Sequence, residues 1–197
     1  MIDQLFSSGG SRIAECIGNA AASLTQSRLK PTLKFGGAEQ LKRTTKYASE
    51  LSRQMPDLAN KLNRILDKLE KNHRLTDRPP KPLHGAPHPH QWLISEQGLG
   101  LVDFDRVCVG DPELDAATFI AEMDFEDAEK IPVDEINGSF LEAYQKTAGS
   151  LDSCLLQTYR CHKHLAKALK AVRSIKSNGD CKARRYVEFV EKVVGSE

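Results

Sequence analysis

The sequence lacks any long apolar run, and its charges almost cancel. Its 197 residues carry 28 Lys and Arg against 27 Asp and Glu, a formal net charge of +1. Because apolar stretches are only a few residues long, no segment predicts a membrane-spanning helix. Near-neutral charge argues against a basic nucleic-acid-binding surface and against an acidic disordered tail. With 40% hydrophobic residues, the composition favours a folded domain that binds neither nucleic acid nor membrane.

Cysteine is also sparse. The five cysteines are scattered, and no two form a C-x-x-C pair. This pattern argues against a disulfide framework or a structural zinc site, and it favours free thiols in a reducing cytoplasm. Residues 1–10 contain no basic cluster and no long apolar stretch, so we expect no secretory signal there. The sequence therefore predicts a cytoplasmic protein.

The net charge conceals a strong pattern along the chain. Residues 1–80 carry 14 basic and 8 acidic side chains, a net +6, and residues 153–197 carry 10 and 4, again +6. Residues 81–152 between them carry 4 basic and 15 acidic side chains, a net −11. This acidic centre is either a metal-binding region or a solvated acidic face, and composition does not choose between them.

Hydrophobic periodicity predicts a mainly helical protein of the α+β class. Apolar side chains recur at three- and four-residue spacing between residues 58 and 69, which is typical of an amphipathic helix. We expect further helices over residues 11–24, 38–55, 112–123, 133–147, 155–172 and 182–193. A short β-hairpin is expected over residues 92–104. The prediction is one domain over residues 1–197, with a helical part (1–82), a central segment (83–123) and C-terminal helices (124–197).

The central segment contains the candidate chemistry. His84, His88 and His90 lie among prolines and a glycine, which predicts a loop. At strand spacing, Asp103 and Asp105 would share one face, so both would approach a single cation. Carboxylate and amide oxygens suit Mg²⁺, and Gln91 and the two aspartates offer such oxygens.

Two other interpretations of these residues stay open. The three histidines are good nitrogen ligands for zinc. Alternatively, the histidines bind the loop backbone and the aspartates brace turns. Asp111, followed by Pro112, is typical of a helix N-cap.

The ordered residues of this segment resemble the aminoglycoside phosphotransferase family, which is related to choline kinase and more distantly to protein kinases. Its members carry H-G-D-x-H-x-x-N, a hairpin, then I-D-F/W-D/E and G-D-P-x-x-D. Here the chain has H-G-A-P-H-P-H-Q from residue 84, V-D-F-D from residue 102 and G-D-P-E-L-D from residue 110. The resemblance implies the helical C-terminal lobe of the kinase-like fold, and ATP- and Mg²⁺-dependent phosphoryl transfer to a hydroxyl of a small molecule.

The resemblance also implies roles for individual residues. Asp103 matches the aspartate that holds the magnesium ions at the nucleotide phosphates, and Gln91 falls where the family usually has a metal-binding Asn. Asp105 matches a secondary acidic position near the metals. His84 and His88 match loop-shaping positions, and the G-D-P-x-x-D aspartates, Asp111 and Asp115, match structural ones.

The first departure from the family lies at residue 86. The family has there an aspartate that orients the attacking hydroxyl and accepts its proton, and this chain has Ala86. A methyl group does neither, and loss of a positioned base costs about 10²–10⁴-fold in rate. His88 or His90 would have to serve as a substitute base. We therefore expect transfer to be impaired.

The second departure is the lobe that covers the nucleotide. Kinase-like enzymes cover the ATP phosphates with a loop on a small β-rich lobe. The residues before the loop read as helices and connectors, and Gly9-Gly10 and Gly36-Gly37 lack the spacing of a phosphate-binding loop. We expect a truncated family member without the N-terminal β lobe. The alternative is a non-catalytic binding or regulatory module, or a fragment completed by a partner chain or a second copy.

Overall fold

The structure, a computed structural model, describes residues 9–73, 78–96, 98–125, 131–174 and 178–195. It is mainly helical and divides into two compact units, which we describe separately. The prediction about residues 1–10 lies almost entirely outside the described residues. No helix in the described part of the chain is long and apolar enough to cross a membrane.

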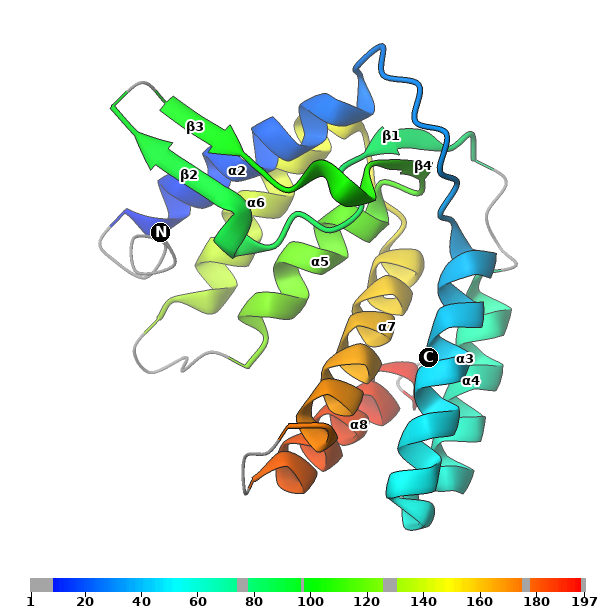
Figure 1. Ribbon diagram of the computed structural model, residues 1–197. Helices are drawn as coiled ribbons and strands as arrows, with labels where there is room; N and C mark the ends of the chain where they lie inside the picture. Colours follow the sequence, from blue (N-terminus) through cyan, green and yellow to red (C-terminus); the bar gives the residue numbers. More distant parts are fainter. Residues whose placement is uncertain (1–8, 74–77, 97, 126–130, 175–177, 196–197) are drawn as a thin grey trace. The chain divides into compact units, whose positions relative to one another are not determined.

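The first unit comprises residues 1–35 and 78–152. Figure 1 shows its helices beneath a β-hairpin. Its helices and strands are α2 (Gly10–Thr25), β1 (Lys81–Leu83), β2 (Trp92–Ser95), β3 (Gly98–Leu101), β4 (Cys108–Gly110), α5 (Glu113–Met123) and α6 (Val133–Ala148), with 3₁₀ turns η2 (Pro89–Gln91) and η3 (Phe104–Arg106).

The core of this unit forms where α2 and α6 approach closely. A Cβ added to Gly18 of α2 would lie 2.4 Å from the carbonyl oxygen of Phe140 in α6, so only glycine fits there. Phe140 stacks on Phe119 of α5 with ring centroids 4.0 Å apart. Buried side chains, both apolar and polar, occur almost throughout α5, which identifies it as the central helix of the unit.

The strands of the first unit form two antiparallel pairs. One pair is the expected hairpin, with Trp92 opposite Leu101 and Ser95 opposite Gly98. The other joins β1 to β4, with Leu83 opposite Cys108, and the sequence did not predict it. This second pair brings the start of the histidine loop beside the segment that leads into α5.

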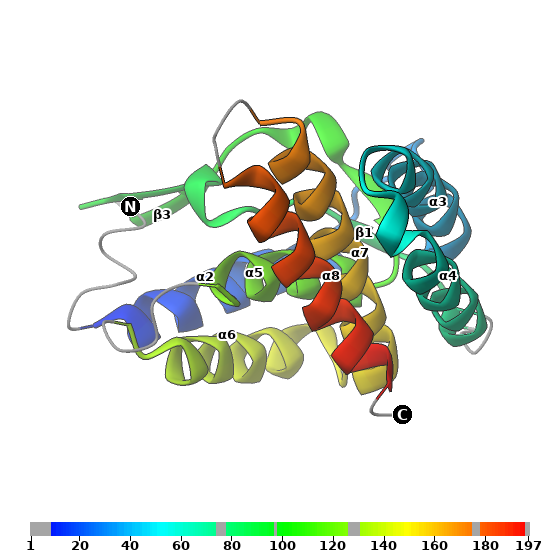
Figure 2. The ribbon, with the colours of Figure 1, turned by 90° about the horizontal axis from the view of Figure 1, so that it is seen from below.

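The second unit comprises residues 36–77 and 153–197. Its helices are α3 (Gly37–Gln54), α4 (Ala59–His73), α7 (Ser153–Val172) and α8 (Gly179–Gly195), with the 3₁₀ turn η1 (Pro56–Leu58) before α4. Figure 2 views α7 and α8 side by side. The four helices bury a common apolar core that includes Leu51, Leu62, Leu165 and Val190.

The expected helices are confirmed to within a few residues, as the hydrophobic periodicity predicted. The mainly helical class with a short hairpin is confirmed as well. One local prediction is wrong: α5 begins at Glu113 with Pro112 as its N-cap residue, so Asp111 is not the cap. The backbone carbonyl of Asp111 instead accepts a hydrogen bond from the Leu114 amide at 2.9 Å. The organisation as one domain over residues 1–197 stays a prediction.

Candidate functional site

The histidine loop is anchored by a buried carboxylate on α5. Asp115 is fully buried, and its two oxygens accept hydrogen bonds from the backbone amides of His84 and Gly85, each at 2.9 Å. Gly85 has φ +85°, and a Cβ there would lie 2.2 Å from the carbonyl oxygen of Arg106. Glycine is required at this position by both the left-handed backbone and the close approach. The structural role expected for Asp115 fits these contacts.

His84 shapes the loop from inside. It is fully buried, its Nε2 donates to the carbonyl oxygen of Val102 at 3.1 Å, and its ring meets Phe104 edge-on. Burial lowers the pKa of His84, since the charged imidazolium loses its hydration there. The neutral ring therefore joins the loop to the residues that follow β3.

Asp103 lies just beyond the end of strand β3, which closes at Leu101. Its backbone is left-handed, with φ 67° and ψ 60°, and it precedes the 3₁₀ turn η3, which holds Asp105. The strand alternation that would place Asp103 and Asp105 on one face therefore does not apply, and that geometric prediction is wrong. Strained backbone of this kind often occurs at functional sites, and Asp is among the residues that tolerate it best.

Gln91 connects Asp103 to the histidine loop. Its Nε2 donates to Oδ2 of Asp103 at 2.6 Å, and its Oε1 accepts a hydrogen bond from the backbone amide of His88 at 2.9 Å. These two bonds assign the amide oxygen and nitrogen unambiguously, since a carboxylate accepts and a backbone amide donates. Gln91 thus brings the carboxylate of Asp103 to the edge of the loop.

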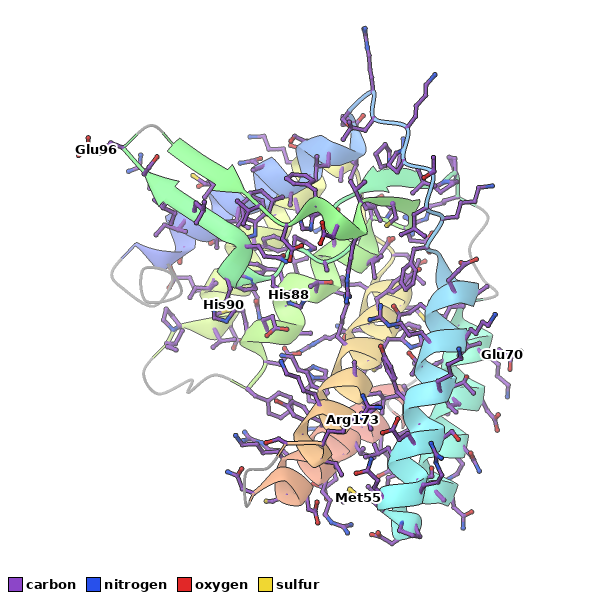
Figure 3. The ribbon with its side chains drawn as sticks, viewed as in Figure 1. Met55, Glu70, His88, His90, Glu96 and Arg173 are labelled. Atoms are coloured by element: carbon purple, nitrogen blue, oxygen red, sulfur yellow. The ribbon has the colours of Figure 1, made fainter. Side chains whose placement is uncertain are left out.

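These residues line a hollow of about 250 Å³, whose walls are Ala86, His88, Gln91, Asp103 and Arg106. Ala86 is 3% exposed, so its methyl group occupies the wall where the family resemblance places a carboxylate. Figure 3 shows His88 and His90 below the hairpin, on the side of α5.

The imidazole of His88 is oriented by an acidic partner. Its Nδ1 lies 3.2 Å from Oε1 of Glu122 on α5. With Nδ1 facing this carboxylate, the other ring nitrogen, Nε2, remains as a proton acceptor. His90 is exposed and does not line the hollow.

The donor set favours a hard divalent cation over zinc. Within the described ranges, no group of three or more His, Cys, Asp or Glu side chains is arranged to hold a metal ion. The three histidines diverge, because His84 is buried against the backbone and His88 faces Glu122. The carboxylate of Asp103 fits Mg²⁺, which is commonly held by one or two protein oxygens together with water and phosphate oxygens. The amide oxygen of Gln91 accepts the His88 N–H instead and does not face Asp103.

A second buried carboxylate lies at the start of α5. Glu113 is fully buried, and its Oε1 accepts hydrogen bonds from Arg78 at 2.5 Å and from the backbone amide of Asp152 at 2.7 Å. The hydrogen bond to Glu113 is the main cause that raises the pKa of Arg78. This contact fastens two distant chain segments to α5 and has no direct part in the hollow.

Sequence reasoning missed two residues of the site, Arg106 and Glu122. Arg106 could have been found, because it is the only Lys or Arg between residues 82 and 129 in an otherwise acidic segment. Glu122 carried no such signal, since its contact with His88 joins residues 34 positions apart in the chain.

A family model described as the phosphotransferase enzyme family matches residues 11–165. No curated protein matches the chain.

Solved structures share the fold. Choline kinase LicA from Streptococcus pneumoniae aligns with a TM-score of 0.69 and 18% identity, over 96% of this chain and 66% of that one. Glucosamine kinase in complex with glucosamine, ADP and inorganic phosphate aligns with a TM-score of 0.61 and 19% identity, over 100% of this chain and 55% of that one. An aminoglycoside-3'-phosphotransferase of type VIII aligns with a TM-score of 0.61 and 23% identity, over 80% of this chain and 61% of that one. The chain thus spans about half to two thirds of the length of these structures.

Proposed function

The chain belongs to the phosphotransferase enzyme family, and from that premise we propose that it is the helical lobe of an ATP- and Mg²⁺-dependent phosphotransferase with impaired transfer activity. The acceptor is a hydroxyl group of a small molecule. The fold shared with choline kinase and glucosamine kinase supports the reaction class, as does the ADP bound in the glucosamine kinase complex.

The acidic and amide side chains at and near the hollow would form the metal site. Asp103 holds Mg²⁺ through its carboxylate, and Asp105 contributes secondary negative charge nearby. Gln91 positions Asp103, and its amide oxygen would reach the metal only after it releases the His88 N–H. Bound Mg²⁺ neutralises the charge that develops on the nucleotide phosphates. The loop anchored by Asp115 keeps these donors in place before any ligand arrives.

The main support for impaired phosphoryl transfer is the methyl group of Ala86 in the wall of the hollow. No proton acceptor stands at this position to align the attacking hydroxyl. Since a positioned base contributes about 10²–10⁴-fold to rate, transfer by this site is expected to be slower by that factor. Residual transfer would use Nε2 of His88, whose ring Glu122 orients.

A second candidate function is a non-catalytic binding or regulatory module of the same fold. The hydrogen bond from Gln91 to Asp103 favours it, because one oxygen of the carboxylate is already satisfied without a ligand. Binding of nucleotide without turnover would distinguish this function from a slow enzyme.

We also propose that a separate chain supplies the nucleotide-covering lobe. The share of each neighbour that this chain covers supports this proposal. So does a group of exposed apolar side chains at and beside the hairpin, which comprises Leu93, Ile94, Val102 and Phe104. Size-exclusion chromatography with light scattering tests it: a monomer alone that enters a complex with such a lobe supports it, and a stable homodimer contradicts it.

The proposed impairment is tested by transfer of labelled phosphate from ATP and Mg²⁺ to aminoglycosides and amino alcohols. The isolated chain is expected to show no appreciable transfer. Asp67→Ala, which changes an exposed aspartate on α4, is the control for Asp103→Ala. Robust turnover that survives Asp67→Ala and disappears in Asp103→Ala would contradict the proposal.

A further inference from the structure

The hollow contains one guanidinium, that of Arg106, which no described side chain engages directly. Asp103 accepts a bond from Gln91, and His88 faces Glu122. Arg106 also lines the hollow and is exposed, yet its guanidinium forms no hydrogen bond or ion pair with any described residue. An unpaired guanidinium in a concave site is a ready partner for an oxyanion.

Residue 86 bears on why this guanidinium is unpaired. Ala86 and Arg106 line the same hollow, and the backbone of Arg106 runs beside Gly85, the neighbour of Ala86. A carboxylate side chain at position 86 would enter the space that these residues enclose. With a methyl group in its place, the hollow keeps both the free volume and the unpaired positive charge.

The size and charge of the hollow limit the ligand. A volume of about 250 Å³ lies below the roughly 300–1,000 Å³ of sites for drug-sized ligands. Asp103 on the wall repels a second negative charge, so a monoanion is favoured over a dianion such as inorganic phosphate at pH 8. A planar carboxylate also matches the paired donors of a guanidinium.

We propose that this hollow binds a small monocarboxylate, held by Arg106 in the space that Ala86 leaves open. The inference goes beyond the proposed function, because it requires neither nucleotide nor phosphoryl transfer. The proposed ligand is a small, negatively charged molecule that carries one carboxylate.

The test is a titration of the full ¹⁵N-labelled chain with acetate, followed by NMR at constant ionic strength with chloride as the balancing anion. Saturable shifts are expected at the Arg106 side-chain Nε–H and at the backbone amides of His88 and Gln91. At pH 8, where inorganic phosphate is mainly the dianion, it should bind more weakly than acetate. Constant ionic strength removes general screening as a cause of the shifts.

Variants separate this site from other arginines and from the magnesium site. Arg106→Gln should weaken acetate binding roughly tenfold or more, and Arg28→Gln, which changes an exposed arginine outside the hollow, should leave it unchanged. Asp103→Asn should strengthen acetate binding while it abolishes Mg²⁺ binding, so the two proposals fail independently. Ala86→Asp should abolish acetate binding, because the new carboxylate occupies the space.

Three results would overturn the proposal. They are the absence of saturable shifts, acetate binding that Arg106→Gln leaves unchanged, and phosphate that binds more tightly than acetate. Because Arg106 is exposed and unbonded, its replacement is expected to leave the spectrum dispersed. Arg106→Lys, which keeps the charge without the paired donors, should give intermediate affinity and provides a second variant.

Discussion

The side-chain amide of Gln91 donates a hydrogen bond from Nε2 to Oδ2 of Asp103 at 2.6 Å. The same amide accepts the backbone N–H of His88. One neutral side chain therefore joins the histidine loop to the carboxylate that follows the hairpin. The arrangement holds the Asp103 carboxylate on the wall of the hollow, while the amide oxygen of Gln91 faces the loop backbone.

Gln91→Ala should destabilise the first unit by about 1–2 kcal/mol, because it leaves the His88 amide without its acceptor. Urea unfolding followed by tryptophan fluorescence measures this effect. Trp92 is the only tryptophan, and it is buried next to residue 91. His90→Ala, an exposed change on the same turn, should stay within about 0.5 kcal/mol. Equal effects of the two variants would show that the bond contributes nothing.

Asp115→Ala should be more severe, about 2–4 kcal/mol, since two buried backbone amides lose their acceptor together. The same fluorescence measurement applies, and amide hydrogen exchange at His84 and Gly85 should accelerate. Asp105→Ala changes an exposed carboxylate and serves as the control, with an effect within about 0.5 kcal/mol. Unchanged exchange at both amides would refute the anchoring role of Asp115.

Three glycine-to-alanine variants separate close contact from backbone strain. Gly85→Ala should be the most destabilising, because its Cβ would lie 2.2 Å from the Arg106 carbonyl oxygen at φ +85°. Gly98→Ala has φ +126° and open space, so only strain acts there. Gly138→Ala lies in α6 with nothing near its Cβ, and it should stabilise by about 0.5–1 kcal/mol. Chemical denaturation ranks the three, and any other order contradicts this account.

The second unit should lose stability in acid through a buried histidine pair. His162 is fully buried, its Nε2 lies 2.7 Å from Nε2 of His73, and its Nδ1 lies 2.8 Å from the hydroxyl of Thr44. Burial, followed by repulsion from His73 and Lys163, lowers the pKa of His162 well below the ordinary 6.5. The unfolded state therefore binds the proton first as the pH falls.

The direction of the pH dependence follows from this difference in proton binding between the folded and unfolded states. Stability contributed by neutral His162 is complete above about pH 6.5 and falls below it, by up to about 1.4 kcal/mol per pH unit. Urea unfolding at pH 7.5 and 5.5, monitored through hydrogen exchange of the α7 amides, measures the decline in the free energy of unfolding. His162→Gln should flatten it, whereas His90→Gln should not. A decline of the same slope in His162→Gln would assign the effect to other groups.

Much of this fold could be predicted from the sequence, because its helices have strong apolar periodicity. The stripe from Leu58 to Leu69 and the hairpin around residues 92–101 depend on local pattern alone. The pairing of β1 with β4 could not be predicted, since each strand has three residues, β1 contains Pro82, and the pairing is long-range.

The candidate site also has a part that the sequence predicted and a part that it did not. Ordered motifs located Ala86, Gln91 and Asp103, all of which line one hollow. The left-handed backbone of Asp103 could not be predicted, because strand alternation was extended past Leu101, where β3 ends, as far as Asp105. Partners distant in sequence, such as Glu122 for His88, depend on how α5 packs beneath the loop.

Mn²⁺ titration of the ¹⁵N-labelled chain tests most directly whether the hollow retains a metal site. Paramagnetic broadening is expected first at the amides around residues 91 and 103, and it should be lost in Asp103→Asn, which keeps the side-chain shape. Asp67→Asn on α4 should respond like the wild type. Identical broadening in wild type and Asp103→Asn, or broadening centred elsewhere, would contradict a metal site at Asp103.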